Sequence, residues 1–247
     1  MTRKSRFDRI ISKGGIFPMA KNALVIIDMQ KDFNVPGAPF RVDCGLEALP
    51  YIEQALKATR ETNIPVFHVF RYYRANGVDC EITRYDAYKS KGFHGCTIAE
   101  EGAEILDSIK PIEGEYQVVK QRWSAFFQTE LDMMLRRLGV KQVIIAGVQT
   151  PNCIRGTVWD ANSLDYEVIV LTDATNAKTP EVHQANLFDM KNIGIKLMTT
   201  QEYCDILKSN PEGPECGNQE RIRHEIETEN GRPQPADMYL FNGRYEK

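Results

Sequence analysis

The chain has 247 residues, of which 42% are hydrophobic and 26% are charged, as in folded globular proteins rather than disordered or fibrous ones. Its 31 Lys and Arg against 34 Asp and Glu leave a formal net charge of -3, so overall charge does not predict a nucleic-acid or membrane partner. No apolar run approaches the roughly 18 residues that span a bilayer. The basic segment from Met1 to Gly15 lacks the apolar centre of a secretory signal, so we expect a cytoplasmic protein.

Short apolar runs rich in β-branched residues recur along the chain and predict strands buried on both faces. These runs are Ala23–Ile27, Pro65–Phe70, Gln117–Val119, Gln142–Ala146, Glu167–Leu171 and Gly194–Met198. Segments with helical period lie between them, with one apolar stripe at Leu46, Leu49, Ile52 and Leu56 and another at Leu131, Met134, Leu135 and Leu138. The alternation predicts a three-layer α/β/α domain with a six-stranded, mostly parallel sheet.

We expect this domain to cover residues 20–207, with an N-terminal extension over 1–19 and a C-terminal extension over 208–247. The tail ends in an apolar patch, Met238 to Phe241, that either clasps another subunit or belongs to a partly disordered segment. The connection from Tyr72 to Gly95 is long and without clear period, which is typical of a functional loop, a lid or a partner contact.

Six cysteines, at positions 44, 80, 96, 153, 204 and 216, show neither the density of a disulfide scaffold nor the spacing of a zinc site. They are expected to be free thiols, and any chemical role has to be argued from the surroundings of each one.

Ligands of parallel sheets lie beyond the carboxyl ends of the strands, so the strand ends are searched first. Asp28 follows the run Leu24–Ile27, and Lys120 follows Val118–Val119. A charged group at the end of a buried strand is costly unless it is paired or used. On these two residues alone, an ordinary ion pair at the sheet edge is the favoured interpretation.

The position of Cys153 favours a functional role for these two residues over an ordinary ion pair. The chain leaves the strand at Gly147 and resumes helical period near Asn152, so the cysteine falls in the first turn of a helix. The N–H groups and the positive dipole end of such a turn favour a thiolate and can also hold an oxyanion.

These motifs together resemble those of the isochorismatase-like cysteine hydrolases, a superfamily that includes nicotinamidase, N-carbamoylsarcosine amidase, ureidoacrylate amidohydrolase and isochorismatase. The resemblance is carried by Leu24–Phe33, by Val119-Lys120 with Arg122–Phe126, by Gly147–Cys153 with Thr157 and Asp160-Ala161, and by Thr172–Ala174. It covers about residues 20–200 in the order of the family.

The resemblance implies that Asp28 is the general base, Lys120 the cation beside it and Cys153 the nucleophile. It also implies a cis peptide bond between Val148 and Gln149, with the N–H groups of Gln149 and Cys153 directed at the carbonyl oxygen of the substrate. The expected chemistry is hydrolysis of a C–N bond in a small amide or ureido compound through a cysteine acyl-enzyme.

Two departures from the family patterns narrow this expectation. Nicotinamidases bind a metal through Asp and His residues between the first two strands, whereas no His occurs here between Asp32 and His68, so a metal-dependent enzyme is disfavoured. Isochorismatases usually lack the cysteine, because cleavage of a vinyl ether needs a proton donor and not a thiol. Vinyl-ether hydrolysis with Cys153 as a bystander, and a member that only binds a metabolite or a partner, stay open as alternatives.

Several further side chains are candidates for the walls of a substrate pocket, each with a structural alternative. Asp32 and Phe33 follow the base by about one helical turn, and His68 ends a strand, where a hydrogen-bonded structural histidine is the more common outcome. Arg71 and Arg84, with Arg74 and Tyr85 nearby, could meet a substrate carboxylate or could simply be solvated. Trp123 and Phe126 fit a pocket wall or a subunit contact equally well.

No cofactor and no metal are predicted. The spacings of His94 with Cys96, and of Cys204, Cys216 and His224, match no common metal site. The chain has neither a Walker lysine motif nor a glycine-rich dinucleotide fingerprint. The expected partners are a small-molecule substrate and further copies of the chain in a homo-oligomer, a dimer or a tetramer.

Overall fold

The computed structural model describes residues 19–90 and 94–229, which fall into two compact units. The first unit ends at Cys216 and contains the sheet. In the second unit the described part begins at Gly217 and holds one helix, α9 (Asn218–Glu229). The predicted N-terminal extension up to residue 18 and the apolar patch at 238–241 lie outside the described residues.

All six predicted strands form, and they build one sheet in the order β3-β2-β1-β4-β5-β6. Their bounds are β1 (Asn22–Ile27), β2 (Val66–Arg71), β3 (Tyr116–Lys120), β4 (Gln142–Val148), β5 (Glu167–Asn176) and β6 (Lys196–Met198). Every pairing between these strands is parallel. The predicted α/β fold is confirmed, and the expectation of a mostly parallel sheet is met in full by the six strands.

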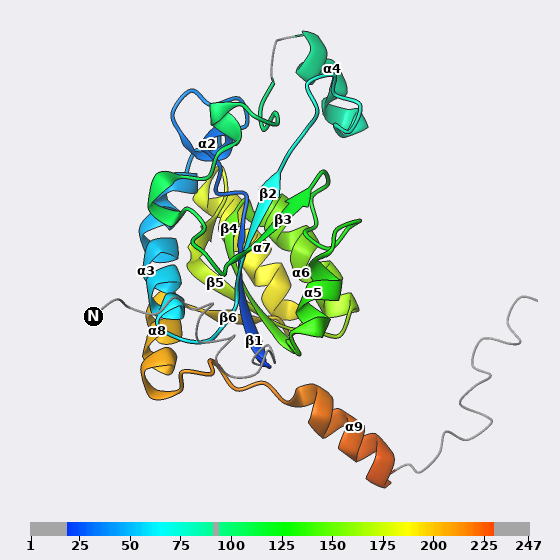
Figure 1. Ribbon diagram of the computed structural model, residues 1–247. Coiled ribbons are helices and arrows are strands. Elements are labelled where there is room, and N and C mark those ends of the chain that lie inside the picture. Colours follow the sequence, from blue (N-terminus) through cyan, green and yellow to red (C-terminus); the bar gives the residue numbers. More distant parts are fainter. Residues whose placement is uncertain (1–18, 91–93, 230–247) are drawn as a thin grey trace, which may run out of the picture. The chain divides into compact units, whose positions relative to one another are not determined.

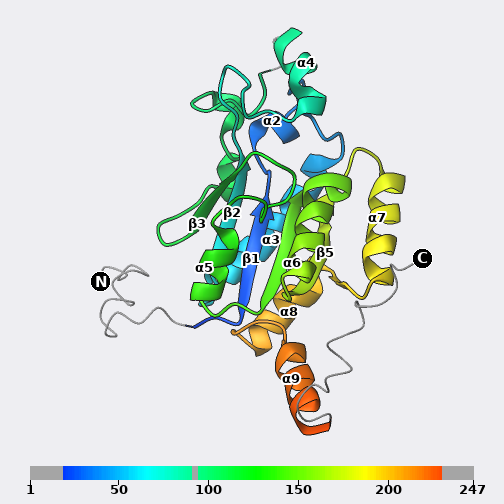
Figure 2. The same ribbon diagram turned by 90° about the vertical axis from the view of Figure 1, so that its right-hand side faces the viewer.

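Helices cover both faces of the sheet, which gives the three layers visible in Figures 1 and 2. One face carries α3 (Leu49–Arg60) and α8 (Thr200–Ser209), and the other carries α5 (Leu131–Arg137), α6 (Arg155–Ser163) and α7 (Pro180–Asn192). Local sequence sets several of these helix starts. Thr199 and Glu202 form a capping box at the start of α8, and Thr179 caps α7 ahead of Pro180.

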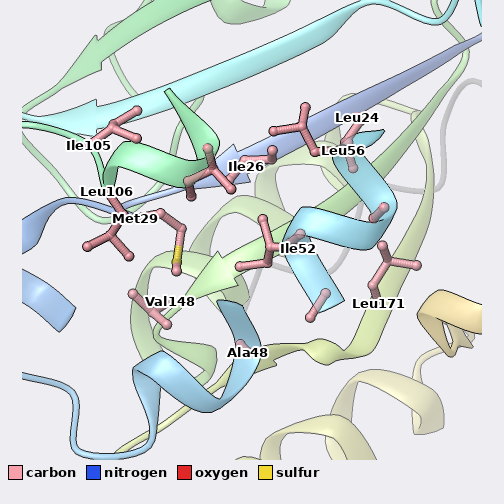
Figure 3. Packing of buried hydrophobic residues seen from close by; sticks show 14 of the residues in the cluster. Leu24, Ile26, Met29, Ala48, Ile52, Leu56, Ile105, Leu106, Val148 and Leu171 are labelled. Carbon is pink, nitrogen blue, oxygen red and sulfur yellow. The ribbon is translucent and has the colours of Figure 1, made fainter. Parts of the chain in front are cut away.

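Two apolar cores result from the alternation of side chains along the strands. Leu24 and Ile26 of β1 pack with Ile52 and Leu56 of α3 in the first core (Figure 3). Val25 and Ile27 point to the opposite face and pack in the second core, which also holds Cys153. A central strand is therefore apolar on both faces, as the continuous run in the sequence predicts.

Gly147 is required where β4 passes β1. Its φ is 113°, and a Cβ at this position would lie 2.0 Å from the carbonyl oxygen of Ile27. Only glycine allows this backbone conformation and this close approach together. The pairing of Gly147 with Ile27 places the turn after β4 beside the end of β1.

The connection after β2 differs from its predicted irregular form. It contains a helix, α4 (Ile82–Ser90), whose apolar residues do not form a stripe, and Ile82 is 91% exposed. Because little of its surface is buried, helical periodicity is absent from the sequence there. The helix lies near the carboxyl ends of the strands, as does α2 (Lys31–Asn34) (Figure 1).

The C-terminal side of the first unit extends beyond the predicted domain end at 207. Helix α8 continues to Ser209, and the side-chain amide of Asn22 donates to the carbonyl oxygens of Glu212 and Pro214 at 2.9 and 3.1 Å. These bonds tie the segment after α8 to the start of β1.

Candidate active site

Three neighbouring strands end in charged side chains at one edge of the sheet. Asp28 directly follows β1, Arg71 is the last residue of β2, and Lys120 is the last residue of β3. Arg71 and Lys120 are register partners in the parallel ladder, so both side chains leave the sheet on the same face. All three residues have no solvent-exposed surface.

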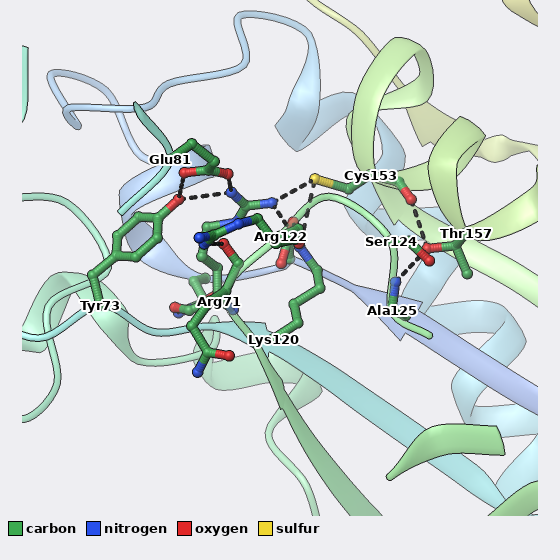
Figure 4. Close-up of polar contacts among 12 residues, drawn as sticks. Arg71, Tyr73, Glu81, Lys120, Arg122, Ser124, Ala125, Cys153 and Thr157 are labelled. Atoms are coloured by element: carbon green, nitrogen blue, oxygen red, sulfur yellow. Dashed lines mark hydrogen bonds and ion pairs between the residues drawn. The ribbon is translucent and has the colours of Figure 1, made fainter. Parts of the chain in front are cut away.

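Lys120 connects the acid to the thiol (Figure 4). Its Nζ donates to Asp28 Oδ2 at 2.7 Å and lies 3.5 Å from Cys153 Sγ. A third bond, of 3.2 Å, goes to the backbone oxygen of Arg122. The ammonium is thus held by three acceptors, and the acid, amine and sulfur of the sequence prediction lie in one cluster.

Asp28 has a backbone conformation that side chains other than glycine rarely adopt, with a φ of 54°. Its backbone N–H donates to the carbonyl oxygen of Val69 at 2.9 Å, which continues the ladder by one residue beyond β1. Oδ1 of its carboxylate is buried and accepts no hydrogen bond from the described residues.

Cys153 lies in a π-helical turn, η4 (Thr150–Ile154), between β4 and α6. The predicted helix start near Asn152 is therefore a wider turn that continues into α6, and such turns are frequent at functional sites. The peptide bond between Val148 and Gln149 is cis. Hydrogen bonds fix the turn from outside, because Thr150 Oγ1 lies 2.8 Å from His183 Nδ1.

The opposite side of the turn is joined to the segment after β3. Thr157 Oγ1 donates to the carbonyl oxygen of Cys153 at 2.7 Å and accepts from the N–H of Ala125 at 3.0 Å. The segment that carries Arg122 is thereby fixed against the turn that holds Cys153 (Figure 4).

The thiol of Cys153 is almost fully buried, with 3% of the residue exposed. Burial has the largest effect on its pKa and raises it. The negative charge of Asp28 also raises this pKa, whereas the charges of Lys120 and Arg71 lower it. The two cations therefore oppose the effect of burial on this sulfur.

Arg71 is the substrate-pocket candidate that the structure brings into the cluster. Its Nη2 lies 3.4 Å from Cys153 Sγ and 3.0 Å from the backbone oxygen of Arg122. Its Nη1 donates to Tyr73 Oη at 2.7 Å and forms a short ion pair with Glu81. The side chain is fully buried, so Arg71 is not the solvated arginine that was the alternative in the sequence analysis.

His68 does not reach this cluster. Strand residues alternate between faces, so His68 lies on the face opposite Arg71. Its Nε2 bonds Glu115 at 2.9 Å, and Glu115 also accepts from Arg60 of α3 at 2.8 Å. This hydrogen-bonded arrangement matches the structural alternative for His68.

Other pocket candidates are likewise engaged elsewhere. Asp32 Oδ2 accepts from the N–H of Cys96 at 2.6 Å, and Phe33 stacks on Phe40 with ring centroids 5.6 Å apart. Arg84 lies over the ring of Phe40 at 5.1 Å. Phe126 is buried 5.7 Å from the ring of Tyr166.

Trp123 lines a surface pocket of about 520 Å³ and is 46% exposed. The walls come from the segment after β3 and from η4 with α6, namely Arg122, Trp123, Ser124, Phe127, Pro151, Asn152, Arg155, Gly156, Trp159 and Asp160. The pocket includes Asn152, the residue before Cys153, and Arg122, but not Asp28, Lys120 or Cys153.

Sequence reasoning did not identify Glu81 and Tyr73, which hold the guanidinium of Arg71. Both lie in the connection after β2, where no period marked buried positions. The one available signal was the strand itself, because an arginine at the end of a buried strand needs an acidic partner.

Among the residues that the structure describes, no group of three or more His, Cys, Asp or Glu could hold a metal ion.

Across residues 19–90 and 94–229, no helix has both the length and the apolar character of a bilayer-crossing segment.

The comparisons with known proteins agree with the fold. A family model described as the isochorismatase domain matches residues 22–202. A protein named "probable inactive nicotinamidase" from Arabidopsis thaliana is 44% identical over 75% of this chain and 95% of its own length. A ureidoacrylate amidohydrolase from Cronobacter sakazakii is 28% identical over 77% of this chain and 90% of its own.

Among solved structures, an isochorismatase family protein from Desulfovibrio vulgaris is 43% identical, with a TM-score of 0.73. The match covers 76% of this chain and 99% of that one. The family model spans most of the chain and includes each strand end of the cluster, so this chain belongs to the isochorismatase family of hydrolases.

Proposed function

We propose that this protein is a cysteine-dependent hydrolase that cleaves a C–N bond in a small amide or ureido compound. The observation that carries the proposal is the contact of Lys120 Nζ with both Asp28 Oδ2 and Cys153 Sγ. A base, a cation and a thiol in mutual contact are the groups that nucleophilic acyl transfer requires.

In the proposed reaction, Asp28 takes the proton of the Cys153 thiol while the sulfur attacks the carbonyl carbon. The carbonyl oxygen becomes an oxyanion, which the N–H groups of Gln149 and Cys153 stabilise. Protonated Asp28 then gives its proton to the departing nitrogen as the C–N bond breaks. Water, deprotonated by the same carboxylate, attacks the thioester, releases the acid and restores the thiol.

The relatives support the choice of a C–N bond. One is named as an amidohydrolase of a ureido acid and another as a nicotinamidase, although the latter is described as probably inactive. A small-molecule substrate follows from the same comparison. Assembly into a homo-oligomer and a cytoplasmic location stay predictions from the sequence, as do the bounds of the domain at 20–207.

The test is release of ammonia by the purified protein from ureido acids, carbamoyl amino acids, maleamate and nicotinamide. We expect hydrolysis of at least one of them, lost in Cys153→Ala with the fold retained by circular dichroism. Cys44→Ala is the matched control, because Cys44 is a half-buried thiol whose sulfur donates to the carbonyl oxygen of Lys178 at 3.5 Å. Hydrolysis that survives in Cys153→Ala would exclude the covalent route.

A second candidate is a member that binds a metabolite without turnover. It is favoured by the 3% exposure of Cys153 and by the guanidinium of Arg71 against its sulfur. In that case no compound of the panel releases ammonia, and binding of a panel compound is still detected by calorimetry. The vinyl-ether alternative predicts instead that isochorismate is cleaved equally by the wild type and by Cys153→Ala.

A further inference from the structure

Hydrogen bonds fix both the backbone and the guanidinium of Arg71. Its backbone N–H donates to Gln30 Oε1 at 2.7 Å, and its backbone oxygen accepts from Gln30 Nε2 at 2.9 Å. Glu81 and Tyr73 both bond Nη1, and Glu81 also accepts the hydroxyl of Tyr73 in a short hydrogen bond. The planar guanidinium is therefore fixed in position and orientation, with Nη2 facing the sulfur.

The charged groups around the sulfur come from the ends of three strands. Asp28 follows β1, Arg71 ends β2 and Lys120 ends β3. Glu81 lies behind Arg71 and does not touch the sulfur. The thiol thus has one anion and two cations beside it.

The two cations have different partners. Lys120 donates to both Asp28 and the sulfur, so it is attracted to the negative charge whether the carboxylate or the sulfur carries it. Arg71 donates to the sulfur, and its other guanidinium hydrogen bonds go to Tyr73, Glu81 and the backbone oxygen of Arg122. When the proton passes from the thiol to Asp28, the negative charge moves to the sulfur. The electrostatic attraction between this charge and Arg71 then increases more than its attraction to Lys120.

We infer that Arg71 is a catalytic residue of this site, whose Nη2 stabilises the thiolate of Cys153, and that Glu81 and Tyr73 are its positioning residues. The inference rests on the proposed function only in so far as the thiolate is used in catalysis. It assigns a task to the connection after β2, since Glu81 and Tyr73 belong to that segment.

A purely structural role for the Arg71–Glu81 pair would leave the ionisation of Cys153 unchanged. The decisive measurement is therefore the pH titration of the thiolate by its ultraviolet absorbance, taken as the difference between each protein and its Cys153→Ala counterpart. The difference isolates one thiol among six, and it needs neither substrate nor access of a reagent to the buried sulfur.

In Arg71→Met we expect the midpoint of the Cys153 titration to rise by about one pH unit or more, which is about tenfold less thiolate at neutral pH. Arg71→Lys should recover part of this loss because it restores a cation. Arg74→Met is the matched control. Arg74 lies three positions away on the same connection, pairs with Asp79 at 2.8 Å, and has a side chain that is 63% exposed, so the midpoint should not move.

Removal of Arg71 alone leaves the Glu81 carboxylate buried and unpaired, which can unfold the protein. The double variant Arg71→Met with Glu81→Gln removes both charges and retains the size of the acid. If the single variant does not fold, the midpoint of the Cys153 titration is measured in the double variant. A midpoint within 0.3 of a pH unit of the wild type, on the order of a twofold change in thiolate, in either folded variant would overturn the inference.

The outcome is separable from that of the proposed function. A raised midpoint in a protein that hydrolyses no amide supports the role of Arg71 toward the thiolate and argues against the proposed reaction. An unchanged midpoint in a protein that does hydrolyse amides leaves the reaction in place and removes Arg71 from it.

Discussion

Lys120 Nζ and Asp28 Oδ2 lie 2.7 Å apart, although 92 positions separate the two residues in the chain. Both side chains are fully buried. Their charges compensate each other in a region from which water is excluded, so loss of one charge affects the other more than it would at the surface.

The first prediction concerns the stability of this pair. Lys120→Met leaves a buried carboxylate unpaired and should lower the free energy of unfolding by roughly 3–5 kcal/mol, measured by urea denaturation. Adding Asp28→Asn should recover much of that loss. Lys110→Met is the control, because Lys110 forms an ion pair of the same 2.7 Å with Asp107 in an exposed position, so its loss should lower the free energy of unfolding far less. Equal losses in the two lysine variants would contradict the argument from burial.

The second prediction concerns the role of Asp28 as the proton acceptor. Asp28→Asn retains the shape of the side chain and removes its basicity, so turnover of an amide substrate should fall by about 10²- to 10⁴-fold. Asp43→Asn, at an exposed aspartate, serves as the control and should leave kcat unchanged. A kcat for Asp28→Asn within about threefold of the wild type would assign the proton to another group.

The third prediction concerns acid sensitivity at the other face of the sheet. Burial acts to raise the pKa of Glu115, but its hydrogen bonds with His68 and Arg60 outweigh burial and lower that pKa from 4.5 to about 2. A depressed folded-state pKa stabilises the protein above the unfolded-state value, and that stabilisation is lost as the pH falls through the folded-state value. The free energy of unfolding should therefore decrease between pH 4.5 and about pH 2.

Glu115→Gln should flatten this part of the stability curve, as measured by urea denaturation over the same range. Glu113→Gln, two residues away and exposed, should leave the slope as it is in the wild type. A wild-type slope in Glu115→Gln would show that other carboxylates govern the acid transition.

The fourth prediction concerns Gly147, at the end of the pairing between β4 and β1. Gly147→Ala places a Cβ 2.0 Å from the carbonyl oxygen of Ile27 and should lower the thermal midpoint strongly, with a loss of at least about 2 kcal/mol. Gly194→Ala is matched to it, because Gly194 has a φ of 92° and no atom within 4 Å of an added Cβ. The difference between the two variants separates steric overlap from backbone strain. Similar losses would show that the close approach itself costs little.

Local sequence was sufficient to predict the fold and to place Asp28 and Lys120 at the ends of buried strands. A buried parallel strand needs a continuous apolar run, and an acid or an amine at its end is conspicuous, which made Asp28 and Lys120 visible without coordinates. The alternation within β2 also holds the information that His68 and Arg71 face opposite sides. That information becomes usable only when the strand is known to extend to Arg71 rather than to end at Phe70.

The environment of each group was decided by the tertiary structure alone. Arg71 is buried because Glu81 and Tyr73 approach it from a connection without hydrophobic periodicity, and the path of such a segment depends on contacts with distant parts of the chain. Asp32, Phe33 and Phe126 are predicted to lie near a substrate, and the structure shows the hydrogen bonds and ring contacts that hold them. Periodicity along a strand or helix is a local property that the sequence determines, whereas the choice of partner for a buried charge is made across the whole fold.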